Sequence, residues 1–102
     1  MDLTKHPKTQ LSIVSEAAIE ARLLRDARRL GAQAWTVAEV RGAGREGVRE
    51  GAWEADRTVE IRLICDAAVA DAIARHVLDV YAPHYAVSMA FSQVSVLRPD
   101  RF

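Results

Sequence analysis

Residues 31–51 read GAQAWTVAEVRGAGREGVREG, and they predict a helix end, a strand and then a long loop rich in glycine and arginine. Apolar and polar residues roughly alternate from Ala34 to Val40, which favours a strand. In the loop, glycines let the backbone pass close to a ligand with its N–H groups pointing inward, and arginines add forked donors for phosphate or carboxylate. This stretch is therefore a candidate anion or nucleotide site. The alternative is a surface hairpin with solvated charges.

The composition predicts one globular domain covering residues 1–102. The chain has 102 residues, 50% of them hydrophobic, and a formal net charge of +0 at pH 7. Zero net charge gives no support for nucleic-acid binding, which favours a basic face. The polar start has no apolar core of a secretion signal, and no apolar stretch reaches the roughly 20 residues of a membrane span. We therefore expect a cytoplasmic protein with no nucleic-acid partner and no membrane insertion.

The predicted elements follow the order strand, helix, strand, strand, helix, strand. We expect residues 1–8 to be flexible and Leu11–Val14 to form a short strand, which ends where Ser15 caps a helix. The later elements are a helix over 17–30 stopped by Gly31, a strand over 34–40, a loop over 41–57, a strand over 58–65, a helix over 67–81 capped by Asp66, and a strand over 86–97 bulged near 92–93. This order predicts an α+β, ferredoxin-like βαββαβ fold. We place Trp35 on the uncovered sheet face, where another copy of the chain is the simplest cover.

No residue pattern indicates a catalytic site or a metal site. His6, His76 and His84 show no metal-binding spacing. The serines of the last strand lie in no nucleophile motif, and the carboxylates form no evident acid–base pair. Cys65, the single cysteine, lies in an apolar run and is interpreted as a small buried hydrophobic residue. The glycine-rich loop has neither the GxGxxG fingerprint nor a Walker lysine, so we expect no enzyme activity.

Two segments, GAQAWTVAEVRGAGR and TVEIRLICDAAVADAI, resemble the PII signal-transduction superfamily. In that family a segment ending T-V-x-E-V-x-G-x-G-R enters a long T-loop, here residues 41–57, and the second segment leaves it. The resemblance covers about residues 10–98. It implies a ferredoxin-like homotrimer that binds adenine nucleotides in clefts between subunits and signals to a protein partner through the T-loop.

The resemblance also implies which residues bind the nucleotide. Gly42, Ala43, Gly44 and Arg45 match the T-loop base that lines the cleft. The other matching positions are Thr36 and Ile64 near the adenine, Arg49 at the phosphate, and Arg98 and Arg101, which match C-terminal arginines that approach phosphates. No catalytic residue and no metal ligand is implied.

Departures from the family pattern narrow the implied function. The glycine- and lysine-rich B-loop is absent, since only residues 82–86 separate the second helix from the last strand, and this favours ADP or AMP over ATP. Glu46 replaces a glutamine of the classical signature, and its charge would repel 2-oxoglutarate. Residues 41–57 contain no Tyr, Ser or Thr, so this loop has no hydroxyl for uridylylation or phosphorylation.

These departures place the chain nearer the PII-like proteins of bicarbonate-transport and carboxysome operons. That branch implies bicarbonate as a candidate co-ligand and a transporter or carboxysome-related protein as the partner. Two other functions stay open: a ferredoxin-like trimeric enzyme with slow nucleotide hydrolysis, and a metal-binding trimer.

Overall fold

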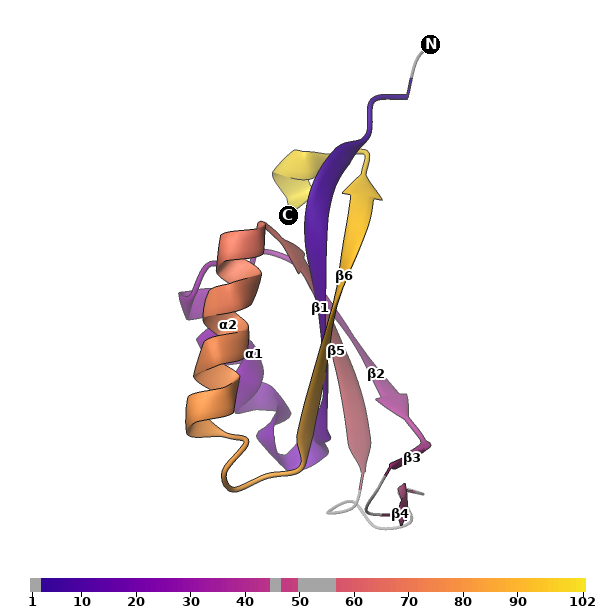
Figure 1. Ribbon diagram of the computed structural model, residues 1–102, viewed down its shortest axis with the longest axis vertical. Coiled ribbons are helices and arrows are strands. Elements are labelled where there is room, and N and C mark those ends of the chain that lie inside the picture. The colour runs from indigo at the N-terminus through magenta and orange to yellow at the C-terminus, as the bar shows by residue number, and fades with distance from the viewer. Residues whose placement is uncertain (1–2, 45–46, 50–56) are drawn as a thin grey trace.

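The computed structural model describes residues 3–44, 47–49 and 57–102, and Figure 1 shows a twisted sheet with two helices on one face. The elements are β1 His6–Glu16, a 3-10 turn Ala17–Ile19, α1 Glu20–Arg29, β2 Trp35–Val40, β3 Gly42–Gly44, β4 Gly47–Arg49, β5 Thr58–Cys65, α2 Ala67–Val80, β6 Val87–Val96 and a 3-10 turn Pro99–Arg101. The main sheet has the strand order β2-β5-β1-β6, and each neighbouring pair is antiparallel. This is the ferredoxin-like βαββαβ fold that the sequence predicted.

β1 lies inside the sheet and pairs with a strand on each side. Leu11 is opposite Leu63 of β5 and also opposite Phe91 of β6. Because successive strand residues point to opposite faces, the odd-numbered residues of these three strands share the helix-covered face. Leu11 and Leu63 are both 0% exposed there. Burying each such side chain contributes roughly 1.5–3 kcal/mol.

The core fills the space between this face and the two helices. Its main members are Leu11, Ile13, Ile19, Leu23, Ala27, Ile61, Leu63, Cys65, Ala70, Ile73 and Val77. Burial raises the pKa of the Cys65 thiol, which keeps it protonated at neutral pH. Cys65 is therefore the buried hydrophobic residue that its apolar surroundings in the sequence suggested.

The first strand is longer than predicted, and the predicted cap at Ser15 is wrong. β1 begins at His6 and continues to Glu16, so Ser15 is a strand residue opposite Val59 and Val87. Pairing on both sides holds this segment extended, and Ser15 is only 1% exposed. A 3-10 turn then separates the strand from α1, which begins at Glu20.

Trp35 lies on the helix-covered side, contrary to the prediction that placed it on the uncovered face. It is opposite Leu63 and packs against the core. The Arg28 guanidinium lies 5.8 Å from the centre of its ring, a cation–π distance. Since Trp35 shares a face with Leu63, the alternation of β2 turns Thr36 and Ala38 toward the uncovered face.

The predicted bulge in the last strand is also wrong. β6 pairs with β1 in one unbroken register from Val87 to Val96. The apolar residues change face instead: Met89 lies on the helix side, whereas Val94 lies on the other side, opposite Lys8. A shift in hydropathy along this strand therefore marks a change of surroundings and not a break in pairing.

The helix ends agree with the sequence in part. Gly31 follows α1 with φ +120°, as a stop residue should, and Ala32 N–H donates to the Ala27 carbonyl at 3.0 Å. Asp66 stands at the N-cap of α2, but its side chain makes no capping bond. It accepts a hydrogen bond from Lys8 Nζ at 2.7 Å instead.

No helix in the described part of the chain is long and apolar enough to cross a membrane.

Replacing Gly31 by alanine should destabilise the fold by about 1–3 kcal/mol, because an L-residue is strained at this φ. The new Cβ would also lie 3.3 Å from Val69 Cγ2, closer than most Cβ contacts. The matched control is Gly42→Ala, since Gly42 has no positive φ and no described atom lies within 4 Å of its new Cβ. Urea unfolding measures both; equal free energies of unfolding for the two variants would contradict this reading of Gly31.

Candidate functional site

The candidate site begins where β2 leaves the sheet. After Arg41 the chain forms β3, which pairs antiparallel with β4, so that Gly42 lies opposite Arg49, Ala43 opposite Val48 and Gly44 opposite Gly47. The described part of the 41–57 segment is thus a small ladder of its own rather than a loop without structure. The pairing brings the backbones of two predicted site residues, Gly42 and Arg49, together. Arg45 lies outside the described residues.

The base of this segment is fixed to the sheet at both ends. Arg57, just before β5, forms an ion pair with Glu39 of β2. The Arg57 carbonyl also accepts a hydrogen bond of 2.8 Å from Ala17 N–H, at the end of β1. The entry and exit of the segment are therefore tied to each other and to the turn before α1. Gly42 is exposed next to this base, where no described atom would crowd a side chain.

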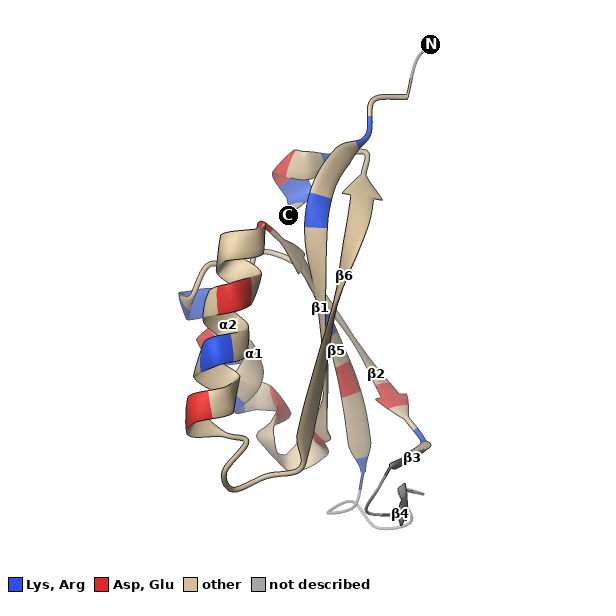
Figure 2. Cartoon of the chain, viewed as in Figure 1, with Lys and Arg blue, Asp and Glu red and all other residues tan. Residues whose placement is uncertain are grey.

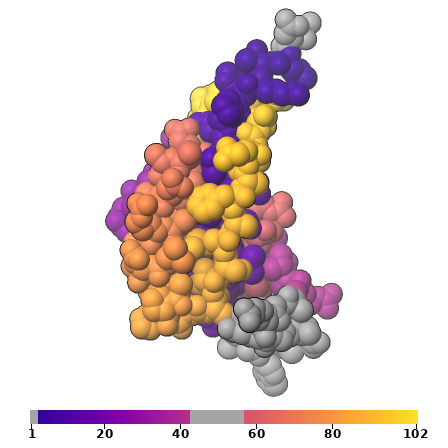
Figure 3. Space-filling view, viewed as in Figure 1, coloured from indigo at the N-terminus to yellow at the C-terminus, as the bar shows by residue number. Residues whose placement is uncertain are grey.

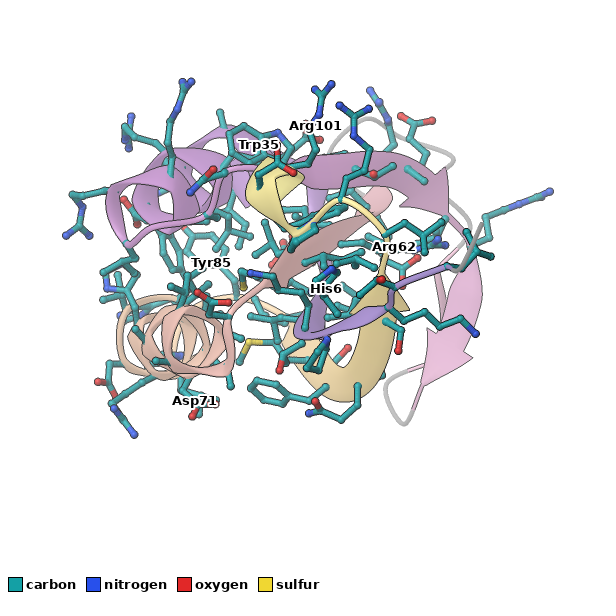
Figure 4. The ribbon with its side chains drawn as sticks, turned by 90° about the horizontal axis from the view of Figure 1, so that it is seen from above. His6, Trp35, Arg62, Asp71, Tyr85 and Arg101 are labelled. Carbon is teal, nitrogen blue, oxygen red and sulfur yellow. The ribbon has the colours of Figure 1, made fainter. Side chains whose placement is uncertain are left out.

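The uncovered sheet face brings Thr36 and Ile64 to the same side. Thr36 is opposite Arg62 of β5, and Ile64 is two residues farther along the same face. Figure 4 shows Arg62 on the side of the sheet away from the helices. The predicted adenine-side residues therefore share a face and lie near each other, but at the end of β2 opposite to Gly42.

A polar network that sequence reasoning missed lies on this face. Ser12 Oγ donates to Glu60 Oε2 at 2.6 Å, and Arg62 Nε donates to Glu60 Oε1 at 3.1 Å. The Ser12 hydrogen bond, more than the partial burial that opposes it, lowers the pKa of Glu60. The alternation of β5 predicted that Glu60 and Arg62 share a face. Ser12 reaches them because β1 is the neighbour of β5 in the sheet, which the alternation does not predict.

Apart from this network, the uncovered face carries few charges. Figure 2 shows charged residues mostly on the helices and at strand ends, and β6 holds none. Figure 3 shows β6 running along the surface beside α2, and its outer edge has no partner strand among the described residues. An unpaired edge offers backbone donors and acceptors to another chain.

Within one chain, Arg98 and Arg101 lie away from the hairpin that β3 and β4 form. They belong to the C-terminal turn, and Figure 1 places this turn at the opposite end of the long axis from β3 and β4. The long axis extends 49 Å. A site that uses both the hairpin and these arginines therefore needs a second copy of the chain.

A second polar cluster joins the two helices. Asp26 Oδ2 accepts hydrogen bonds from His76 Nε2, at 2.9 Å, and from the Tyr81 hydroxyl. Arg22 Nη2 donates to the Tyr85 hydroxyl at 2.9 Å and lies over both tyrosine rings. Figure 4 shows Tyr85 between the helices. Burial and the bond to Asp26 raise the pKa of Tyr81. These residues come from distant segments, and no spacing in the sequence links them.

The described residues hold no group of three or more His, Cys, Asp or Glu side chains that could bind a metal ion. His76, which belongs to the Asp26 cluster, serves to tie α2 to α1.

Comparisons with known proteins identify the family. The model of the family described as nitrogen regulatory protein P-II matches residues 8–101. A PII-like signalling protein from Thermus thermophilus is 33% identical, with a TM-score of 0.84 over 100% of this chain and 99% of that chain. The chain therefore belongs to the P-II family of regulatory proteins. Within the superfamily it is a PII-like protein.

Two more distant structures share the fold. CPII, a nitrogen regulatory PII-like protein from Thiomonas intermedia K12, is 19% identical and has a TM-score of 0.88 over 99% of this chain and 98% of that chain. That structure has CPII bound to ADP, AMP and bicarbonate. GlnK from B. subtilis, in a complex with ATP, is 15% identical with a TM-score of 0.60 over 86% of this chain and 83% of that chain. A search of the curated proteins found no match.

Asp26→Asn should make the protein less sensitive to acid. Burial alone would raise the pKa of Asp26, but hydrogen bonds from Tyr81 and His76 outweigh it and hold the pKa below its ordinary value of 3.8. Because the folded state then binds this proton less readily than the unfolded state, the contribution to stability is present at neutral pH and is lost as the pH falls below about 4. Urea unfolding at pH 7 and pH 3 measures the loss.

Wild type should lose more free energy of unfolding between these two pH values than Asp26→Asn does. At pH 7 the variant should be less stable by about 1–3 kcal/mol, since it weakens a partly buried acceptor of two hydrogen bonds. The control is Asp71→Asn, which removes an exposed carboxylate of α2 and should behave as wild type. Equal acid sensitivity of wild type and Asp26→Asn would show that this cluster does not control acid stability.

Proposed function

We propose that this protein is a PII-like regulatory protein that binds adenine nucleotides, ADP or AMP in preference to ATP, in clefts between the subunits of a homotrimer. The observation that carries the proposal is the match of residues 8–101 to the P-II family, together with 33% identity to a PII-like protein over the whole chain. The 41–57 segment between β2 and β5 takes the place of the family's T-loop.

The arrangement of the site supports a cleft between copies. Thr36 and Ile64 offer a face near the adenine, and the hairpin of Gly42, Ala43 and Gly44 offers backbone N–H groups for phosphate. Arg45 and Arg49 of the 41–57 segment add forked donors, and Arg98 and Arg101 come from a neighbouring copy. Within one subunit the β3–β4 hairpin and the C-terminal turn lie at opposite ends of the molecule, so trimer formation would bring them together in one site.

Bicarbonate is the proposed co-ligand. It is a small planar anion, and Arg45 or Arg49 with the hairpin N–H groups suits such a group. CPII, which shares the fold, has been solved with ADP, AMP and bicarbonate. Binding at the base of the 41–57 segment changes the surface that a protein partner meets. A transporter or a carboxysome-related protein in the cytoplasm would then receive a signal of inorganic-carbon or energy status.

Two other functions predict different results. A ferredoxin-like trimeric enzyme would hydrolyse nucleotide slowly, and a metal-binding trimer would take up divalent ions. Isothermal titration with ADP, followed by analysis of the nucleotide afterwards, separates the three. Binding of intact ADP supports the sensor, product formation supports the enzyme, and uptake of metal without nucleotide supports the third.

Arg45→Ala should weaken ADP binding by about 1.5–3 kcal/mol, roughly ten- to a hundredfold, because a charge-assisted bond to phosphate is lost. Isothermal titration of ADP into wild type and variant measures this. The matched control is Arg75→Ala, which removes an exposed arginine of α2 and should leave the affinity unchanged. Unchanged ADP affinity in Arg45→Ala would count against the assigned cleft.

A further inference from the structure

In the turn that joins α2 to β6, all of whose residues the structure describes, no backbone N–H group is free for a ligand. Ala82 N–H donates to Val77 O at 2.9 Å, and the N–H groups of His84 and Tyr85 donate to Tyr81 O at 2.9 and 3.0 Å. The remaining residues of this turn are Pro83, which has no N–H, and Ala86. Ala86 N–H donates to Glu16 Oε2 at 3.0 Å. An acidic side chain of the protein thus takes the one donor that the turn does not use itself.

Glu16 lies where three parts of the chain meet. It is the last residue of β1 and is opposite Thr58, the first residue of β5. Its neighbour Ala17 donates to the Arg57 carbonyl at the exit of the 41–57 segment. Figure 1 shows the end of β1, the α2–β6 turn and the β3–β4 hairpin at one end of the molecule. Glu16 is half-buried, and the hydrogen bond from Ala86 N–H positions its carboxylate.

The charge of Glu16 acts on anions bound at this end of the molecule. Ala86 N–H already donates to a charged acceptor of the same chain, so a phosphate that took this donor would first have to displace the Glu16 carboxylate. Electrostatic repulsion falls with distance and grows with the charge of the ligand. A triphosphate carries more negative charge than a monophosphate and extends farther, so it meets more repulsion.

We propose that Glu16 is a specificity-determining residue. Its carboxylate takes Ala86 N–H, the one donor of the α2–β6 turn that a ligand phosphate could otherwise use, and selects against ligands with a long polyphosphate chain. This inference rests on the proposed function, in which the phosphates bind at the base of the 41–57 segment. It assigns the preference for short phosphate chains to a residue that is not among the predicted nucleotide-binding residues.

The decisive variant is Glu16→Gln, which keeps an oxygen acceptor for Ala86 N–H and removes the charge. Isothermal titration with AMP, ADP and ATP gives the affinities. We expect ATP to bind about tenfold more tightly to Glu16→Gln than to wild type, and AMP to change by less than about twofold. The effect should shrink at high salt. The control Glu20→Gln removes a carboxylate in the first turn of α1 and should leave the ATP-to-AMP affinity ratio unchanged.

An unchanged ATP-to-AMP ratio in Glu16→Gln, or a wild type that binds ATP as tightly as AMP, would overturn the role of Glu16 and leave adenylate binding intact. A wild type that binds no adenylate would instead overturn the proposed function and this inference with it. Hydrogen exchange gives a second readout: the Ala86 amide should be protected in wild type and exchange faster in Glu16→Ala. Fast exchange of this amide in wild type would contradict the bond on which the inference depends.

Discussion

The pairing of β1 with a strand on each side is the constraint on which the rest of this structure depends. Its register with β5 and β6 sends Leu11 and Ile13 into the core and Ser12 to the opposite face. A slip of one residue would exchange the two faces. The same strand ends at Glu16, so its length also decides where the 41–57 segment and the α2–β6 turn are attached. Core packing and the geometry of the candidate site therefore have one origin.

The two faces of the sheet serve different purposes. The covered face buries aliphatic side chains against α1 and α2, and the Asp26 cluster then fixes the two helices to each other. The uncovered face carries Thr36 and Ile64 around the Ser12–Glu60–Arg62 network. Glu60 and Arg62 already pair with each other within one chain. Contact with another copy would therefore not leave either charge without a partner. This is the arrangement expected of a subunit in the proposed symmetric assembly.

Local patterns predicted the regular parts of the fold. The alternation of Thr58–Cys65 gave the bounds of β5, and Gly31 ended α1 as its backbone freedom suggested. The errors arose where tertiary pairing overrode a local signal. Ser15 has the chemistry of a cap, but pairing with β5 and β6 keeps it in a strand. Trp35 looked suited to an uncovered face, yet its register with Leu63 turns it toward the core.

The candidate site was predictable only to the extent that family motifs carry it. Thr36 and Ile64 do share a face, but the β3–β4 ladder lies in a segment that the motifs predicted only as a loop. The Glu16–Ala86 bond and the Asp26 cluster join residues 50 or more positions apart, so they depend on topology that no single segment encodes. The proposed role of Arg98 and Arg101 depends on a neighbouring copy of the chain, so the sequence of one chain does not show which groups they would meet.

Native mass spectrometry with AMP and ADP tests the central claim most directly, because it counts subunits and nucleotides in the same particle. We expect a trimer that takes up as many as three adenylates, one for each cleft. A monomer, or a trimer that stays free of nucleotide at saturating AMP and ADP, would contradict it.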